Sequence, residues 1–279
     1  MSDCIWSWSL LQAGSLRLDG GGMFGVVPKV MWSRLTPPDD SNRIPLQTNC
    51  LLLKSGERRV LIETGCGDKW SDKLRRIFGI EERTVVDALR ELQTTPDQID
   101  DVIVTHLHFD HAGGLTRIGD YDDAIPVFKK AAVHVQGREW EDALANCSTM
   151  TGTYLRTHLD PIVDNVRLLS GDEEILPGIR SLPMPGHTWG QQAVLVETEQ
   201  GTVCFPGDVM PTRHHVGAPY SMGYDMLPYE NMLSKRLLLE RASDESWTLV
   251  LDHDPTHPVV RVHRTGDWFE LETCSDSRK

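Results

Sequence analysis

The stretch THLHFDHAGG, residues 105–114, places three imidazoles and one carboxylate within six positions, as His106, His108, Asp110 and His111. Neutral imidazole is the commonest metal ligand, and carboxylates bind many of the same ions. Four ligands so close in sequence fit a single ion poorly, but they can serve two ions a few ångströms apart. The stretch therefore predicts a dinuclear metal site, an arrangement that suits hydrolysis.

The residues before this motif favour the same interpretation. Residues 101–105, DVIVT, form a short apolar run rich in β-branched side chains, which is typical of a buried strand. The ligands then lie on the loop that leaves the end of this strand. Gly113 and Gly114 allow that loop to turn tightly.

More ligand candidates recur downstream, and each directly follows a strand-like apolar run. They are His187 in PGHT, Asp208 in FPGD and His253 in DHDP. A surface loop that is rich in histidine by chance is the alternative for the first motif. Three further loops of this kind, in this order, strongly disfavour that alternative.

The composition indicates one folded domain over residues 1–279. The chain has 39% hydrophobic residues and eight tryptophans, and we find no linker between the ligand loops. Its 28 basic and 41 acidic residues give a net charge of −13, which disfavours a nucleic-acid partner. We therefore expect a small-molecule substrate. The oligomeric state is left open, with a homodimer as one option.

Targeting signals are not found in the sequence. The first eleven residues lack a basic start followed by a long apolar core, and no apolar run approaches the length of a membrane span. The six cysteines include no Cys-x-x-Cys pair, so neither a disulfide framework nor a zinc knuckle is predicted. A cytoplasmic protein with no membrane partner is expected.

Hairpins alternate with helices along the chain, which favours mixed sheets covered by helices. Hairpins are predicted over residues 49–63 and 194–205, and helices over residues 84–93, 138–144 and 228–241. In the last helix, Tyr229, Leu233 and Leu237 lie on one face. Lys235, Arg236 and Arg241 are expected to be available to solvent.

The order His-x-His-x-Asp-His, then His, Asp and His, resembles the metallo-β-lactamase superfamily. The resemblance implies an α+β fold, the four-layer αββα sandwich with two mixed β-sheets covered by helices. It implies a first ion bound by His106, His108 and His187, a second bound by Asp110, His111 and His253, and a bridge formed by Asp208. Glu63 stands where the superfamily usually has the aspartate of Asp-Thr-Gly, so we expect it to support a ligand rather than bind metal.

Within the superfamily, the chain is most similar to the acyl-homoserine lactonase and methyl parathion hydrolase-like branch. This implies a dinuclear hydrolase of a small ester, lactone or phosphoester that uses a metal-bridging hydroxide, with Asp110 orienting or receiving the proton. Zinc is the favoured ion, with iron, manganese or cobalt as alternatives. A non-hydrolytic member, either a mononuclear iron oxygenase or a ligand-sensing protein, is the alternative function.

Two segments, residues 19–34 and 211–228, are expected to form loops around the active site. The first would place Met23 and Phe24 over the substrate, although an ordinary connection between strands is equally compatible with its composition. The second would contribute His215 and Tyr220 to the pocket wall.

A tyrosine is expected to act on the substrate. Members of the lactonase branch typically carry one three residues after the bridging aspartate, where this chain has Pro211. We expect Tyr224, from the same segment, to supply the hydroxyl that orients substrate or stabilises an oxyanion, with Tyr220 and His215 as competitors.

Overall fold

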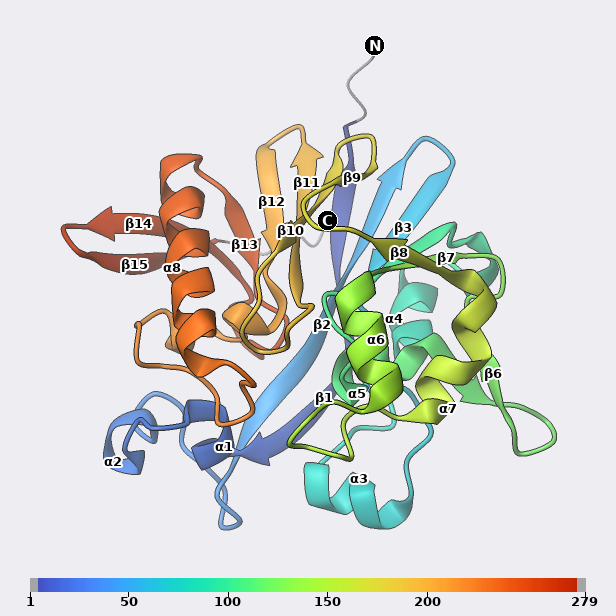
Figure 1. Ribbon diagram of the computed structural model, residues 1–279, viewed down its shortest axis with the longest axis horizontal. Helices are drawn as coiled ribbons and strands as arrows, with labels where there is room; N and C mark the ends of the chain where they lie inside the picture. The colour runs from blue at the N-terminus through green and yellow to red at the C-terminus, as the bar shows by residue number, and fades with distance from the viewer. Residues whose placement is uncertain (1–4, 275–279) are drawn as a thin grey trace.

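The computed structural model describes residues 5–274, in which two mixed β-sheets pack against each other and helices cover both outer faces (Figure 1). In spatial order, the first sheet contains β1 (Ser7–Asp19), β2 (Arg43–Ser55), β3 (Arg58–Ile62), β4 (Asp101–Ile103), β7 (Ala132–Gln136) and β8 (Val166–Leu169). The second contains β15 (Trp268–Thr273), β14 (Val259–Thr265), β13 (Thr248–Val250), β12 (Gly201–Phe205), β11 (Gln192–Thr198), β10 (Ile179–Pro183) and β9 (Glu174–Leu176). A separate hairpin pairs β5 (Thr116–Ile118) with β6 (Ala124–Pro126).

Helices connect many of these strands along the chain and cover the outer faces of the sheets. The α-helices are α1 (Gly20–Phe24), α2 (Lys29–Trp32), α3 (Asp72–Phe78), α4 (Val85–Glu91), α5 (Phe109–Ala112), α6 (Gly137–Ala145), α7 (Arg156–Leu159) and α8 (Pro228–Asp244). The short 3₁₀ helices are η1 (Pro96–Gln98), η2 (Gly113–Leu115), η3 (Asp160–Asn165), η4 (Gly207–Val209) and η5 (Arg213–His215). Within residues 5–274, no helix combines the length and apolar character needed to cross a bilayer.

Alternating side chains on apolar strands create the four layers. In β3, Val60 and Ile62 point into the cluster between the two sheets, whereas Leu61 packs toward the helices that cover the first sheet. In β12, Val203 faces the same central cluster, and Cys204 faces α8. Both faces of these strands are buried, which explains their nearly continuous apolar sequences. The predicted hairpins and the αββα layering are confirmed.

Helix α8 differs from its sequence prediction in the face that it buries. Tyr229, Leu233 and Leu237 are 66%, 42% and 46% exposed, whereas Leu238 and Lys235 are buried. The ammonium group of Lys235 donates to the carbonyl oxygens of residues 217 and 220, at 2.9 and 2.7 Å. These acceptors allow a lysine to occupy the inner face, so the prediction that Lys235 faces solvent was wrong.

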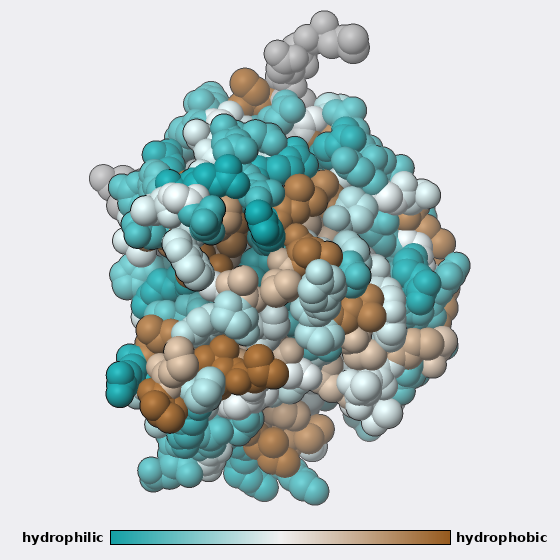
Figure 2. Space-filling view, turned by 60° about the vertical axis from the view of Figure 1, so that its left-hand side comes forward, coloured by the Kyte–Doolittle hydropathy of each residue, from teal (hydrophilic) through white to brown (hydrophobic). Residues whose placement is uncertain are grey.

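Segment 20–35 folds into α1 and α2 at the end of β1 (Figure 1). The side chain of Asp19 caps α1 by accepting a hydrogen bond from the backbone of Gly22 at 2.8 Å. Trp32 is buried, whereas Val26 and Val30 are exposed. Figure 2 brings this side of the molecule and α8 forward, and hydrophobic patches interrupt its polar surface.

Candidate metal centre

The carboxyl ends of four strands bring the seven predicted ligands together. The loop after β4 leads into α5 and carries the first motif, and single ligand loops follow β10, β12 and β13. All seven side chains are buried, and the most exposed of them, Asp110, is only 8% accessible. Residues that are nearly 150 positions apart in the sequence therefore meet between the two sheets, as the spacing of motifs and strands predicted.

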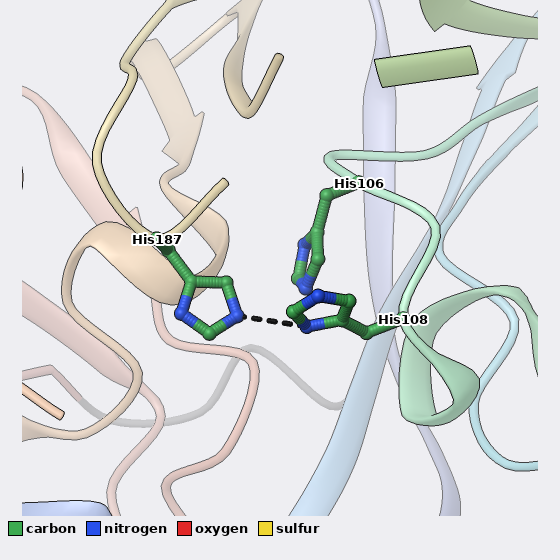
Figure 3. Close-up of side chains that lie close together, drawn as sticks. All are labelled: His106, His108 and His187. Atoms are coloured by element: carbon green, nitrogen blue, oxygen red, sulfur yellow. Dashed lines mark hydrogen bonds between the residues drawn. The ribbon is translucent and has the colours of Figure 1, made fainter. Parts of the chain in front are cut away.

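Three of the imidazoles form one group (Figure 3). His106, His108 and His187 point toward one another, and their ring centroids are 4.5–4.8 Å apart. The Nε2 atom of His187 lies 2.9 Å from Nδ1 of His108. Their ligand atoms lie close enough to hold one metal ion.

The imidazoles of His111 and His253 form a second group beside the first, and Asp208 faces both groups. Its Oδ2 atom is 3.0 Å from Nε2 of His187 and 3.9 Å from Nε2 of His106. Its Oδ1 atom is 3.3 Å from Nε2 of His253 and 3.8 Å from Nε2 of His111. One carboxylate oxygen is thus directed at each group, which is the placement that a bridging ligand requires.

Asp110 lies beside the second group. Its two carboxylate oxygens lie 3.8 Å from Nε2 of His111 and 3.6 Å from Nε2 of His253. Asp110 also lines a cavity of about 310 Å³ that opens onto the site. The same carboxylate is therefore placed to contact both a metal ion and a bound substrate.

Hydrogen bonds fix the orientation of individual imidazoles. Nδ1 of His106 is 3.1 Å from the hydroxyl of Thr105, and Nδ1 of His253 is 2.8 Å from the carbonyl oxygen of Gln47. In both rings the Nε2 atom is left to face the site. Such partners usually set the tautomer and direction of a metal-binding histidine.

Asp225 orients His187 and was missed in the sequence analysis. Its Oδ1 atom lies 2.9 Å from Nδ1 of His187. Its Oδ2 atom accepts hydrogen bonds from the Met222 backbone and the Asn231 side chain, at 3.0 and 2.9 Å. No local pattern marked this aspartate, because the imidazole that it orients lies 38 positions earlier in the sequence. The only signal was its position beside Tyr224 in the predicted active-site loop.

Glu63 lies behind His111. Its Oε1 atom accepts a 2.6 Å hydrogen bond from the backbone of Thr105, and its Oε2 atom is 3.4 Å from Nδ1 of His111. The residue has a positive φ of 67°, a conformation that a non-glycine side chain rarely adopts. The strained turn directs this carboxylate at Nδ1 of the imidazole, whereas Nε2 of the same ring faces Asp110 and Asp208.

The two groups differ in electrostatics. Burial and the neighbouring imidazoles hold the pKa values of His106 and His108 well below the ordinary value, so both rings are neutral. Burial also opposes protonation of His111, but the carboxylates of Glu63 and Asp110 outweigh it and raise its pKa to about 9. Carboxylates therefore dominate the second group, and imidazoles dominate the first.

Unpaired polar atoms indicate that the residues fit metal ions. Within the described part of the chain, Nε2 of His106 and Oδ1 of Asp208 are buried without a hydrogen-bond partner. Burial of such atoms is costly unless another group compensates them. Both atoms are directed at neighbouring ligands, so cations between the ligands would satisfy them.

The cavity beside the ligands is largely apolar. Met23 and Tyr224 line it, as predicted, together with residues of both groups. The other lining side chains are Leu18, Phe78, Phe109, Met150, Thr153 and Met222. This wall offers apolar contacts on one side and metal ligands on the other.

Three side chains predicted to line the pocket lie behind its wall instead. Phe24 is fully buried and stacks on the ring of His215, with centroids 4.8 Å apart. Nε2 of His215 is 2.8 Å from the carbonyl oxygen of Met23, and the ring of Tyr220 meets Phe24 edge-on. These contacts support the pocket wall, because aromatic groups from both loops pack together and exclude water.

Glu139 connects the two loops of the first group and was also missed. Its Oε1 atom accepts hydrogen bonds from the Leu107 backbone at 2.9 Å and the Tyr154 hydroxyl at 3.0 Å. Its Oε2 atom accepts from the hydroxyl of Thr188 at 2.6 Å. Leu107 lies between two ligands, and Thr188 directly follows a third.

Known proteins are similar to this chain over most of its length. A family model described as the Metallo-beta-lactamase superfamily matches residues 43–253. An N-acyl homoserine lactonase from Bacillus thuringiensis is 30% identical over 236 residues, covering 80% of this chain and 86% of the relative. N-acyl homoserine lactonase AiiB from Agrobacterium fabrum is 23% identical, covering 94% of this chain and 98% of the relative.

Solved structures share the fold. A probable metal-dependent hydrolase from Staphylococcus aureus has a TM-score of 0.86 and 29% identity, covering 98% of this chain and 99% of its own. An N-acyl homoserine lactone hydrolase with N-hexanoyl-L-homoserine bound at its catalytic metal centre has a TM-score of 0.68 and 25% identity, covering 89% and 93%. A dizinc quorum-quenching lactonase, at 16% identity and a TM-score of 0.80, shows the likeness of fold alone.

Proposed function

The chain belongs to the metallo-beta-lactamase superfamily, and from this membership we propose that it is a metal-dependent hydrolase that opens a lactone ring. The observation that carries the proposal is the placement of Asp208 between two ligand groups at the end of a largely apolar cavity. The N-acyl homoserine lactonases among its relatives support a lactone as the substrate. Small esters and phosphoesters are secondary candidates for the same site.

Each group of ligands would hold one metal ion. The first ion would be held by His106, His108 and His187. The second would be held by Asp110, His111 and His253, with Asp208 between the two ions. We assign zinc to the site because imidazole nitrogen is its frequent ligand, whereas iron, manganese and cobalt fit similar ligand sets. When bound, two such ions lower the pKa of a water that they share and polarise the substrate carbonyl.

Asp110 and Tyr224 would act on the substrate directly. Asp110 lines the cavity beside the second group, where its carboxylate can orient the attacking water and receive its proton. Burial and the nearby carboxylates of Asp19 and Asp110 raise the pKa of Tyr224 to about 12. Its phenol therefore stays protonated near neutral pH and can donate to the oxygen that gains charge.

The cavity wall favours an apolar substituent on the lactone. Met23, Met150 and Met222 line the cavity together with Phe78 and Phe109. Methionine side chains adapt to irregular apolar groups, and burial of each substrate methylene contributes about 0.8 kcal/mol. We expect acyl-substituted lactones to bind more tightly than unsubstituted ones.

Metal content and a substrate panel test this function. The purified protein should contain about two divalent ions per chain and should hydrolyse lactones faster than aryl esters, thioesters or phosphotriesters. A single iron per chain, with no hydrolysis of any of these compounds, would instead identify a non-hydrolytic member of the superfamily.

Tyr224→Phe tests the role of the hydroxyl, because it keeps the ring. Loss of one oxyanion donor typically lowers kcat by about 10²–10³-fold, so we expect a fall of this size with metal content unchanged. Tyr220→Phe is the matched control, since that ring packs on Phe24 outside the cavity lining. Equal kinetics for Tyr224→Phe and the unaltered enzyme would eliminate Tyr224 from the mechanism.

A further inference from the structure

Asp252, two residues after the end of β13, is a buried carboxylate that accepts no hydrogen bond within residues 5–274. The residue is 1% exposed, and within residues 5–274 neither of its carboxylate oxygens has a hydrogen-bond partner. Burial of an ionised carboxylate is costly unless a cation or several donors compensate it. Its position therefore requires an explanation.

The surroundings of Asp252 are those of the second ligand group. Its Oδ2 atom lies 3.9 Å from Nδ1 of His111 and 4.0 Å from Nε2 of His253. Ligand atoms from Asp252, these two histidines and Asp208 all lie within 4.8 Å of one another. Oδ1 of Asp208 also lacks a hydrogen-bond partner in the described part of the chain. Two unpaired carboxylates thus share one small volume with two imidazoles.

Asp254, two residues further on, shows how a structural aspartate differs. It is equally buried, but its carboxylate accepts hydrogen bonds from the backbones of Arg213, Thr256 and His257 at 2.8–3.1 Å. Its charge also pairs with the Arg213 guanidinium at 3.2 Å. In the described part of the chain, Asp252 accepts no such hydrogen bonds, so a role in holding the loop does not account for it.

We propose that Asp252 is an eighth ligand, which binds the second ion beside Asp208. The proposal rests on the dinuclear site of the proposed function and adds a residue to it. The first ion would then meet three imidazoles and one shared carboxylate. The second would meet two imidazoles and the carboxylates of Asp110, Asp208 and Asp252. Oxygen-rich sites suit harder ions, so Mn²⁺ should compete with Zn²⁺ better at the second position than at the first.

Asp252→Asn tests the assignment by metal titration. The metal-free protein is titrated with Zn²⁺ and, separately, with Mn²⁺, against a chelator of known affinity. We expect the variant to bind the first ion as the unaltered chain does and the second more than 100-fold more weakly. Residues that only orient a ligand typically change affinity by about 10–100-fold, so a smaller loss, or an equal loss at both positions, would overturn direct binding.

Asp101→Asn is the matched control. Asp101 is also a buried carboxylate, but it lies at the opposite end of β4 and pairs with His134 and Arg58, both at 2.8 Å. The control should lower the stability of the metal-free protein and leave both metal affinities unchanged. If Asp101→Asn also weakened binding of the second ion, the effect of Asp252→Asn would reflect a general loss of buried charge, and the proposal would fail.

Stability of the metal-free protein gives a second, independent readout. Without metal, an unpaired carboxylate beside Asp208 destabilises the fold, so Asp252→Asn should raise the denaturant midpoint of the metal-free protein while reducing the increase caused by Zn²⁺. A lower midpoint would indicate a structural role and overturn the proposal. Neither readout depends on turnover: absence of lactone hydrolysis would refute the proposed function while the ligand assignment stood.

Discussion

Replacement of Glu139 should loosen both loops of the first ligand group at once. The carboxylate is fully buried and accepts hydrogen bonds from Leu107, Tyr154 and Thr188. A buried donor that loses its partner costs about 1–3 kcal/mol, so Glu139→Ala should lower the free energy of unfolding by roughly 3–9 kcal/mol. Domains are stable by only about 5–15 kcal/mol, so this variant should be largely destabilised.

Glu139→Gln separates the charge from the hydrogen bonds. Its carbonyl oxygen can still accept from Leu107 and Tyr154, and its amide can donate to the Thr188 hydroxyl. Burial raises the pKa of Glu139, which shows that the carboxylate itself is disfavoured at this position. The loss from weaker, neutral hydrogen bonds and the gain from removing a buried charge should offset each other. The free energy of unfolding should therefore stay within about 2 kcal/mol of that of the unaltered protein.

The assay is denaturant unfolding of the metal-free protein, followed by Zn²⁺ competition titration. Glu139→Ala should weaken binding of the first ion by about 10–100-fold, because no hydrogen bonds then connect the two loops that carry its ligands to α6. Glu139→Gln should retain most of the affinity. This reasoning would be refuted if Glu139→Ala kept full metal affinity and a free energy of unfolding within about 1 kcal/mol of that of the unaltered protein.

Two other substitutions give separable outcomes. Asp208→Ala removes the proposed bridge, so metal analysis should show loss of one or both ions together with activity; full metal content with normal turnover would contradict the bridging role. Burial lowers the pKa of Lys235 from 10.5 to about 8, so the unfolded chain binds more protons between these pH values. The unfolding free energy of the unaltered protein, relative to Lys235→Met, should therefore rise by roughly 3 kcal/mol from pH 8 to 10.5. A difference that stays constant with pH would show that Lys235 is not the group responsible.

The ligand loops could be predicted from sequence because their signal is local. An apolar run rich in β-branched residues predicts a strand, and the polar residues that follow it must lie at the strand end. His187 and His253 each follow such a run. Sheet pairing then brings these ends together, as the parallel registers β3–β4 and β12–β13 show.

Other features depended on contacts between distant segments. Phe24 and His215 are separated by most of the chain, and their stacking could not be inferred from either loop alone. For α8, both the exposed stripe and the buried stripe contain leucines, so periodicity did not decide the inner face. The carbonyl oxygens that accept from Lys235 decided it.

The sequence by itself determined the layered fold and the strand-end positions of the seven predicted ligands, because strand patterns and their terminal loops are encoded within a few residues. Tertiary structure alone decided which carboxylates share the site. Asp252 and Asp254 stand two residues apart in one loop, yet of the two only Asp254 accepts hydrogen bonds from other residues between 5 and 274. The cost of a buried charge depends on the groups that surround it, and those groups come from strands that meet only in the folded chain.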